Sequence, residues 1–161
     1  MPKLKPSISI RAAKLKDLPR LAEMGISILK YHQQLDDYFK PSKNAKKIYL
    51  SFFKKCIYSR KNLLLVATDQ DHVIGYSLAN LNSRPPVFEI TKIGVISDMY
   101  IEPNYRKQGL SKEFLQKTYA WFKNKKIHHV HLVYHFKNEL GEKAWTKHGF
   151  KQFMSYNRIK I

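Results

Sequence analysis

The sequence predicts an α/β fold in which a mixed, mostly antiparallel central sheet is covered by helices on both faces. The chain has 161 residues, a length that suits a single domain over residues 1–161. It is 43% hydrophobic and 26% charged, which is the composition of a folded protein and not of a disordered one. Its apolar pattern alternates between strand and helix periodicity, and the order β-α-α-β-β-β-α-β-α-β predicts the fold class.

The first part of the chain predicts one strand and two helices. Ile8 and Ile10 alternate with polar neighbours, as residues of a half-buried strand do. Apolar residues then recur at helical spacing over residues 17–33 and again over residues 44–58.

The middle of the chain predicts three strands. Residues 63–68 and 73–81 are apolar runs on either side of the polar residues 69–72, so we expect a hairpin. Gly75 lies inside its second arm and indicates a bulge or a close backbone approach. Residues 92–101 predict the next strand.

The last part of the chain predicts two helices, each followed by a strand. Helical spacing resumes at Leu110. Residues 129–134 then predict a strand, residues 139–147 a helix, and residues 150–159 a final strand.

The net charge of +18 raises the question of an acidic partner. Most of the basic excess lies in residues 1–60 and 111–161, whereas residues 61–110 are balanced. We expect a lysine-rich solvated surface, and nucleic acid is not the partner that we expect. A basic module that binds nucleic acid or protein remains the alternative function.

The location that the sequence predicts is cytoplasmic, without a membrane partner. No apolar run approaches the roughly 20 residues that span a bilayer, and no apolar stretch of a secretory signal follows the first lysines. Cys56 is the single cysteine and has no partner for an internal disulfide, which suits a reducing compartment.

The turn around Gly109 is the first candidate site. It joins the strand ending near Ile101 to the helix starting at Leu110. Backbone N–H groups at a helix N-terminus, together with the helix dipole, form an anion site that suits a pyrophosphate. Arg106 and Lys107 add positive charge. Taken alone, such a turn also fits an ordinary connection between two elements.

Two motifs at matching spacing resemble the GNAT family of N-acetyltransferases, and the resemblance covers nearly the whole chain. Residues 106–111, RKQGLS, fit the family's Q/R-x-x-G-x-G/A loop for acyl-CoA, with Ser111 where Gly or Ala is usual. Residues 138–150 fit N-x-x-A-x-x-Φ-Y-x-K-x-G-F, with Gly141 at the small Ala and Trp145 at the Tyr.

The resemblance implies that the fourth and fifth strands splay apart and that the pantetheine arm of acetyl-CoA lies in the gap. The backbones of Met99 and Ile101 would pair with the pantetheine amides, and the Met99 N–H would polarise the thioester carbonyl. Asn138 would hydrogen-bond the arm from the other side, and Trp145 would pack against it. The pyrophosphate would lie against Arg106, Lys107, Gln108, Gly109, Leu110 and Ser111.

The resemblance also implies direct attack of a primary amine, on a small molecule or a protein, on the acetyl thioester. Relatives often protonate the leaving thiolate with a tyrosine where this chain has Trp145, and an indole is a poor acid. Either Tyr134 or Ser111 substitutes, or the thiolate leaves without a dedicated acid. Asp98 is the only acid inside the fourth strand and is the candidate base; a carboxylate bonded to a neighbouring loop is the other interpretation.

Tyr31 and His32 lie at the end of the first helix, in the segment that shapes the acceptor groove of the family. We name them as candidate substrate contacts, with a helix end packed by aromatics as the alternative. The resemblance also allows a homodimer. No metal is expected, since no cysteine or acid at ligand spacing accompanies the nearby histidines. These histidines are His128, His129, His131 and His135.

Overall fold

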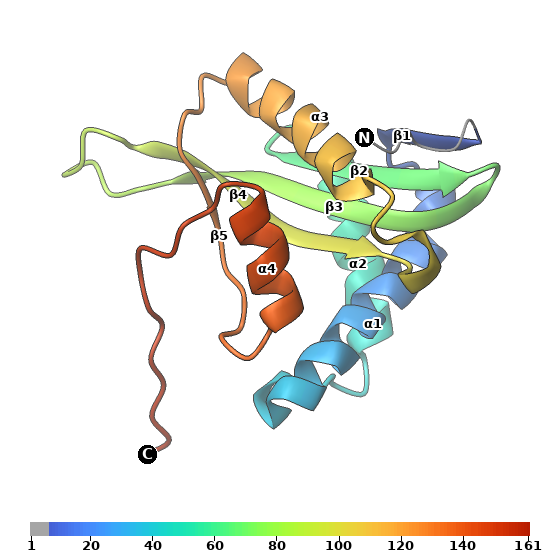
Figure 1. Ribbon diagram of the computed structural model, residues 1–161, viewed down its shortest axis with the longest axis horizontal. Helices are drawn as coiled ribbons and strands as arrows, with labels where there is room; N and C mark the ends of the chain where they lie inside the picture. The colour runs from blue at the N-terminus through green and yellow to red at the C-terminus, as the bar shows by residue number, and fades with distance from the viewer. Residues whose placement is uncertain (1–6) are drawn as a thin grey trace.

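A five-stranded sheet forms the centre of the protein, in the order β1-β2-β3-β4-β5. It is seen in a computed structural model that describes residues 7–161 (Figure 1). β1 to β4 are antiparallel to their neighbours, and β5 is parallel to β4. The strands are β1 (Ile8–Ala12), β2 (Asn62–Asp69), β3 (His72–Ser83), β4 (Lys92–Ile101) and β5 (Val130–Leu132).

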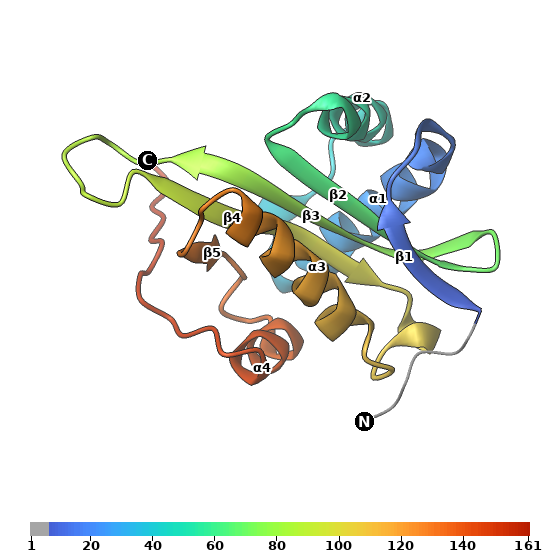
Figure 2. The same ribbon diagram turned by 90° about the horizontal axis from the view of Figure 1, so that it is seen from above.

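Helices cover both faces of this sheet, as predicted (Figures 1 and 2). α1 and α2 lie on one face, α3 lies on the other, and α4 lies beside β5 at the edge. Within residues 7–161 no helix is both long and apolar enough to cross a membrane. The helices are α1 (Leu18–Leu35), α2 (Ala45–Tyr58), α3 (Leu110–Asn124) and α4 (Glu139–Lys147), with short 3-10 turns η1 (Leu15–Asp17), η2 (Asp37–Phe39) and η3 (Pro103–Tyr105).

β2 illustrates why the central strands are apolar along their whole length. Successive side chains of a strand point to opposite faces of the sheet. Leu64 and Val66 pack in the core beneath α1 and α2, whereas Leu65 and Ala67 pack with Phe114 of α3. Both faces of the strand are therefore buried, and no position is left for an alternating polar residue.

The hairpin of β2 and β3 is tighter than the sequence predicts. The two strands extend until only Gln70 and Asp71 remain between them, and Gln70 takes a left-handed φ of 54°. The interpretation of Gly75 as a close approach is confirmed, because a Cβ there would lie 2.7 Å from the carbonyl oxygen of Tyr100 on β4.

Two expectations for the C-terminal part are wrong. β5 is three residues long instead of covering residues 129–134, and residues 150–159 form no strand. The C-terminal tail, residues 150–161, contacts β5 through side chains. The rings of His131 and Phe153 lie 5.0 Å apart. Because β5 is so short, it offers few backbone groups with which the tail could form a ladder.

The predicted splay between β4 and β5 is confirmed. β5 pairs with β4 only from Gly94 to Ile96. On the other side of β4, Leu78 pairs with Asp98 and the next residue of β3 pairs with Ile96, so Ser97 is the extra residue of a β-bulge. Beyond this bulge, residues 97–101 of β4 continue along β3 without β5 beside them.

Candidate active site

The backbone of β4 beyond the bulge faces the gap left by β5. The N–H of Glu102 donates to the carbonyl of Ile74 on β3 at 2.9 Å. Since hydrogen-bonding residues alternate along an antiparallel strand, the backbone groups of Tyr100 also face β3. Those of Met99 and Ile101 then face away from β3, toward the side on which β5 no longer pairs with β4.

The loop that follows β4 bends sharply before α3 begins. Lys107 and Gly109 take left-handed φ values of 60° and 90°, and Gly109 is the N-cap of α3. The first N–H groups of α3 have no partner within the helix and lie at the positive end of its dipole. The guanidinium of Arg106 donates to the Ile101 carbonyl at 2.9 Å, which ties the loop to the end of β4.

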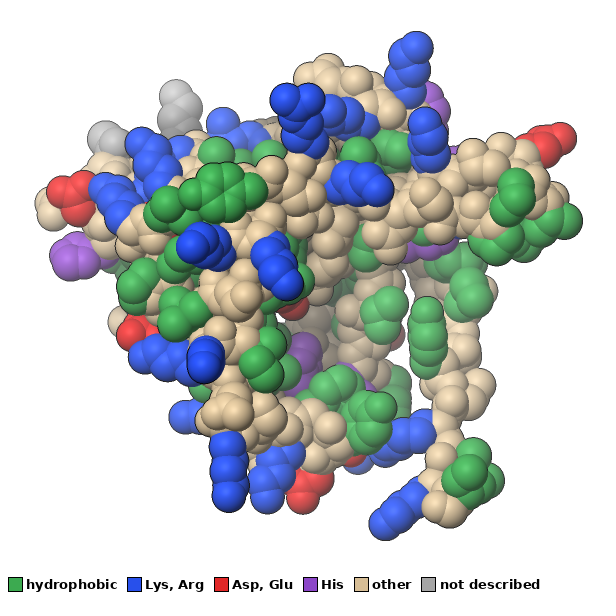
Figure 3. Space-filling model, turned by 180° about the vertical axis from the view of Figure 1, so that it is seen from behind, with side chains coloured by type: hydrophobic (Ala, Val, Ile, Leu, Met, Phe, Trp, Pro, Cys, Tyr) green, Lys and Arg blue, Asp and Glu red, His purple; other side chains and the backbone are tan. Residues whose placement is uncertain are grey.

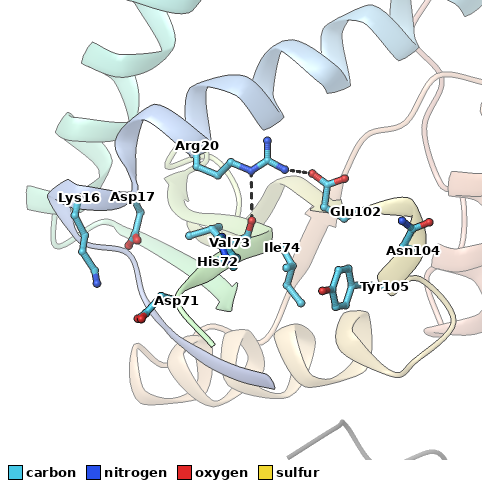
Figure 4. Close-up of a pocket in the computed structure, with 10 residues that line it drawn as sticks. All are labelled: Lys16, Asp17, Arg20, Asp71, His72, Val73, Ile74, Glu102, Asn104 and Tyr105. Atoms are coloured by element: carbon cyan, nitrogen blue, oxygen red, sulfur yellow. Dashed lines mark hydrogen bonds and ion pairs between the residues drawn. The ribbon is translucent and has the colours of Figure 1, made fainter. Parts of the chain in front are cut away.

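Two side-chain contacts hold this loop in place. Arg20 of α1 forms an ion pair with Glu102, and its Nε lies 3.4 Å from the carbonyl oxygen of Val73 (Figure 4). The hydroxyl of Tyr105 donates to Asp69 of β2 at 2.9 Å. The loop is therefore fixed to α1 on one side and to β2 on the other.

A cavity of about 570 Å³ lies next to these contacts, between the start of α1, the β2–β3 turn and η3 (Figure 4). None of the site residues predicted from the sequence lines it. Its Asn104 and Tyr105 directly precede the loop, so the cavity adjoins the candidate site without being part of it.

Asp98 points to the face of the sheet that α1 and α2 cover. The hydroxyl of Tyr76 donates to its Oδ2 at 3.4 Å. Burial raises the pKa of Asp98 to about 6, and the hydrogen bond from Tyr76 opposes that rise. Burial likewise raises the pKa of Tyr49 on α2 to about 12. Asp98 is thus a carboxyl group that can exchange a proton near neutral pH.

Tyr31 reaches across the molecule to Asn138. The C-terminal half of α1 and the start of α4 lie close together (Figure 1), and the Tyr31 hydroxyl is 3.0 Å from the Asn138 Oδ1. The rings of Tyr31 and His32 lie 5.9 Å apart. Burial, and then the nearby His135, lower the pKa of His32. The structure therefore brings Tyr31, with His32 next to it, into contact with one predicted cofactor residue, Asn138.

A set of charged residues beside them was not predicted. Asp36 Oδ2 accepts from Arg158 Nη2 at 2.9 Å and lies 3.5 Å from Nε2 of His135. The guanidinium of Arg158 lies 4.5 Å from the ring centroid of Tyr38. Asp36 and Arg158 are 122 residues apart, and no local sequence pattern links them.

The structure gives different contacts to the three residues considered for the leaving group. Trp145 packs against Phe150, with ring centroids 5.6 Å apart, in the core beneath α3. Ser111 lies 3.1 Å from Nε2 of His148, whose ring lies 6.4 Å from that of Trp145. Tyr134 follows β5 and is half-buried, and its hydroxyl has no hydrogen-bond partner within the part of the chain that the structure describes.

Solved structures share this architecture. A tetramutant of the BH1408 protein from Bacillus halodurans is 18% identical with a TM-score of 0.85, over 95% of this chain and 99% of that chain. A predicted acetyltransferase from Clostridium acetobutylicum with acetyl-CoA is 21% identical with a TM-score of 0.74, over 95% and 96%. An aminoglycoside 6'-N-acetyltransferase from Acinetobacter baumannii is 15% identical with a TM-score of 0.72, over 96% and 99%.

Sequence comparison gives the family directly. No curated protein sequence matches the chain. The sequence profile of the Acetyltransferase (GNAT) family, however, matches residues 28–150, which is most of the chain and includes both motifs. The profile match and the shared fold agree with the splayed strands and the loop at Gly109, and the chain therefore belongs to the GNAT family of N-acetyltransferases, with acetyl-CoA as acyl donor.

Proposed function

We propose that the protein transfers the acetyl group of acetyl-CoA to a primary amine by direct attack of the amine on the thioester. One observation carries this proposal. The backbone groups of Met99 and the N–H of Ile101 face the side of β4 along which β5 no longer pairs, and β4 leads from there into the loop at Gly109. An extended donor with a diphosphate at one end fits such an arrangement.

The donor would be held mainly by backbone groups. Met99 and Ile101 would pair with the pantetheine amides, and Asn138 would bond the arm from the side of α4. The N–H groups from Lys107 to Ser111 would hold the pyrophosphate, with Arg106 adding positive charge. Gln108 and Leu110 complete this loop.

The acceptor nitrogen loses one proton before it attacks the thioester carbon and a second, which passes to solvent, as the tetrahedral intermediate collapses to the amide. Asp98 is the proposed base for the first proton, acting through water. The Met99 N–H would stabilise the oxyanion that develops at the carbonyl. When the C–S bond breaks, the thiolate of CoA takes up a proton, and Tyr134 is the proposed acid. Trp145 would pack against the donor without giving up a proton.

The acceptor side would be formed by Tyr31 and His32. Because burial lowers the pKa of His32, its imidazole is neutral at neutral pH and does not repel an ammonium group. The structural similarity to an aminoglycoside 6'-N-acetyltransferase makes small-molecule amines the first acceptors to test, with protein amines next.

The alternative, a catalytically weak basic module that binds nucleic acid or protein, is not favoured. On the face seen in Figure 3, Lys and Arg side chains are scattered among hydrophobic and neutral ones. They do not gather into one basic surface of the kind that binds a nucleic-acid backbone.

A thiol-release assay with acetyl-CoA and a panel of amines tests the proposal. The panel would contain monoamines, amino acids, polyamines, aminoglycosides and peptides with free N-termini, and calorimetry would measure acetyl-CoA binding separately. We expect acetyl-CoA binding and amine-dependent thiol release. Absence of both from folded protein would contradict the proposed function.

A further inference from the structure

We infer that Tyr31 is a positioning residue whose hydroxyl orients the side-chain amide of Asn138 for the pantetheine arm. This inference rests on the proposed function and concerns the contact between α1 and the start of α4. It connects the helix proposed to meet the acceptor with a residue proposed to hold the donor.

The hydrogen bonds fix which way the Asn138 amide is turned. Its Oδ1 lies 2.9 Å from the backbone nitrogen of Gly141 and 3.0 Å from the Tyr31 hydroxyl. A backbone N–H only donates, so the atom facing Gly141 must be the oxygen. The Tyr31 hydroxyl must then donate to that same oxygen.

The other end of the amide is left to bind something else. With Oδ1 accepting two hydrogen bonds, Nδ2 of Asn138 keeps both of its N–H groups, and neither has a partner within residues 7–161. A pantetheine arm offers amide carbonyl oxygens that accept such donors. Asn138 is only partly buried, so without Tyr31 its side chain is held by one bond and can leave this orientation.

Gly141 leaves the space that the Asn138 amide occupies in this orientation. A Cβ at position 141 would lie 2.6 Å from Nδ2 and 2.9 Å from Cγ of Asn138. An Ala here would displace the Asn138 amide as it now lies. Tyr31, Asn138 and Gly141 therefore form one set, in which the glycine makes room for the orientation that the tyrosine fixes.

The test is a double-mutant cycle on acetyl-CoA affinity, measured by calorimetry in the full chain without acceptor. Tyr31→Phe removes only the hydroxyl and should raise the Kd about three- to tenfold, the effect of one hydrogen bond. Asn138→Ala should raise it further. Because Tyr31 acts through Asn138, the double variant should bind no more weakly than Asn138→Ala alone.

Two further variants complete the experiment. Tyr38→Phe is the matched control, since Tyr38 is 72% exposed, and its Kd should equal that of the wild type. In a Gly141→Ala background the amide is already displaced, so adding Tyr31→Phe should not change the Kd again.

Three results would overturn the inference. An unchanged Kd in Tyr31→Phe, with normal wild-type binding, contradicts the inference alone. Additive effects of Tyr31→Phe and Asn138→Ala do the same, because they place Tyr31 in a separate contact. A folded wild-type protein that does not bind acetyl-CoA contradicts the proposed function and the inference with it.

Discussion

The hydroxyl of Tyr76 donates to the Oδ2 of Asp98 at 3.4 Å, on the face of the sheet that α1 and α2 cover. Tyr76 has no exposed surface, and burial raises its pKa well above the ordinary value. Asp98 therefore has a phenol beside it that stays protonated and keeps donating. The bond stabilises the carboxylate only in part, because burial still raises the pKa of Asp98 to about 6.

The first prediction concerns stability. A carboxyl with an ordinary pKa of 3.8 and a folded pKa of about 6 favours the folded state below about pH 4. That contribution is lost as the pH rises through about 6, where ionised Asp98 costs at most about 3 kcal/mol. Asp98→Asn keeps an acceptor oxygen for Tyr76 and removes the charge. It should therefore raise the free energy of unfolding at pH 8, and much less at pH 4.5.

Urea denaturation at the two pH values measures this effect, and Glu89→Gln, which removes an exposed acid, is the control. If Asp98→Asn is equally stabilising at both pH values, the pKa of Asp98 is not raised in the folded protein. The same variant should lower kcat about a hundredfold or more if Asp98 is the base, and the rising limb of the pH–rate profile near pH 6 should disappear.

Much of the fold can be predicted from the sequence because its elements depend on local patterns. β4 matches the predicted residues 92–101, and α4 matches residues 139–147. Residues 150–159 have the composition of a strand, but a strand also needs a neighbour, and three-residue β5 offers little backbone to pair with. Local composition cannot predict how long that neighbour is.

The same distinction applies to the site. The residues of the loop at Gly109 are consecutive in the sequence, so one local motif predicts both the turn and its role. The contact of Tyr31 with Asn138 spans 107 positions and depends on how α1 and α4 pack. The contact of Asp36 with Arg158 depends on the path of the tail. Neither has a local pattern from which it could be predicted.

The second prediction tests the loop with a pair of matched glycines. Gly109 and Gly149 have nearly the same φ, 90° and 89°. An alanine at either position therefore carries the same left-handed strain, about 1–2 kcal/mol. Gly149→Ala has open space around its new Cβ. We expect both variants to carry this strain but only Gly109→Ala to bind acetyl-CoA about tenfold more weakly or worse, since the backbone there would approach the pyrophosphate.

Thermal melts measure the stability lost by each variant, and calorimetry measures its affinity for acetyl-CoA. An acetyl-CoA affinity that stays at the wild-type value in both Gly109→Ala and Gly149→Ala would place the pyrophosphate elsewhere. Equal losses of affinity would mean that strain, and not position, is responsible.

The third prediction concerns the charge of the acceptor. A chain with a net charge of +18 repels polycations at long range. Asp36, near the proposed acceptor side, is already bonded to Arg158 and so attracts them less. Spermine should therefore have a lower kcat/KM than a neutral-flanked monoamine at low salt, and added salt should narrow the difference by screening. Steady-state kinetics at two ionic strengths measure this. A spermine kcat/KM above that of every other amine at low salt would show that a local acidic field governs acceptor choice.

The last prediction concerns the proton that the departing thiolate receives. Trp145 packs against Phe150 with ring centroids 5.6 Å apart, so Trp145→Phe should preserve most of that packing. An indole N–H is too weak an acid to protonate a thiolate, and the variant should keep most of its kcat under saturating acetyl-CoA. Tyr134→Phe removes the proposed acid and should lower kcat about a hundredfold or more. The reverse pattern, a large loss in Trp145→Phe and none in Tyr134→Phe, would make Trp145 part of the chemistry. Equal kcat values in both variants and the wild type would instead mean that the thiolate leaves without an acid.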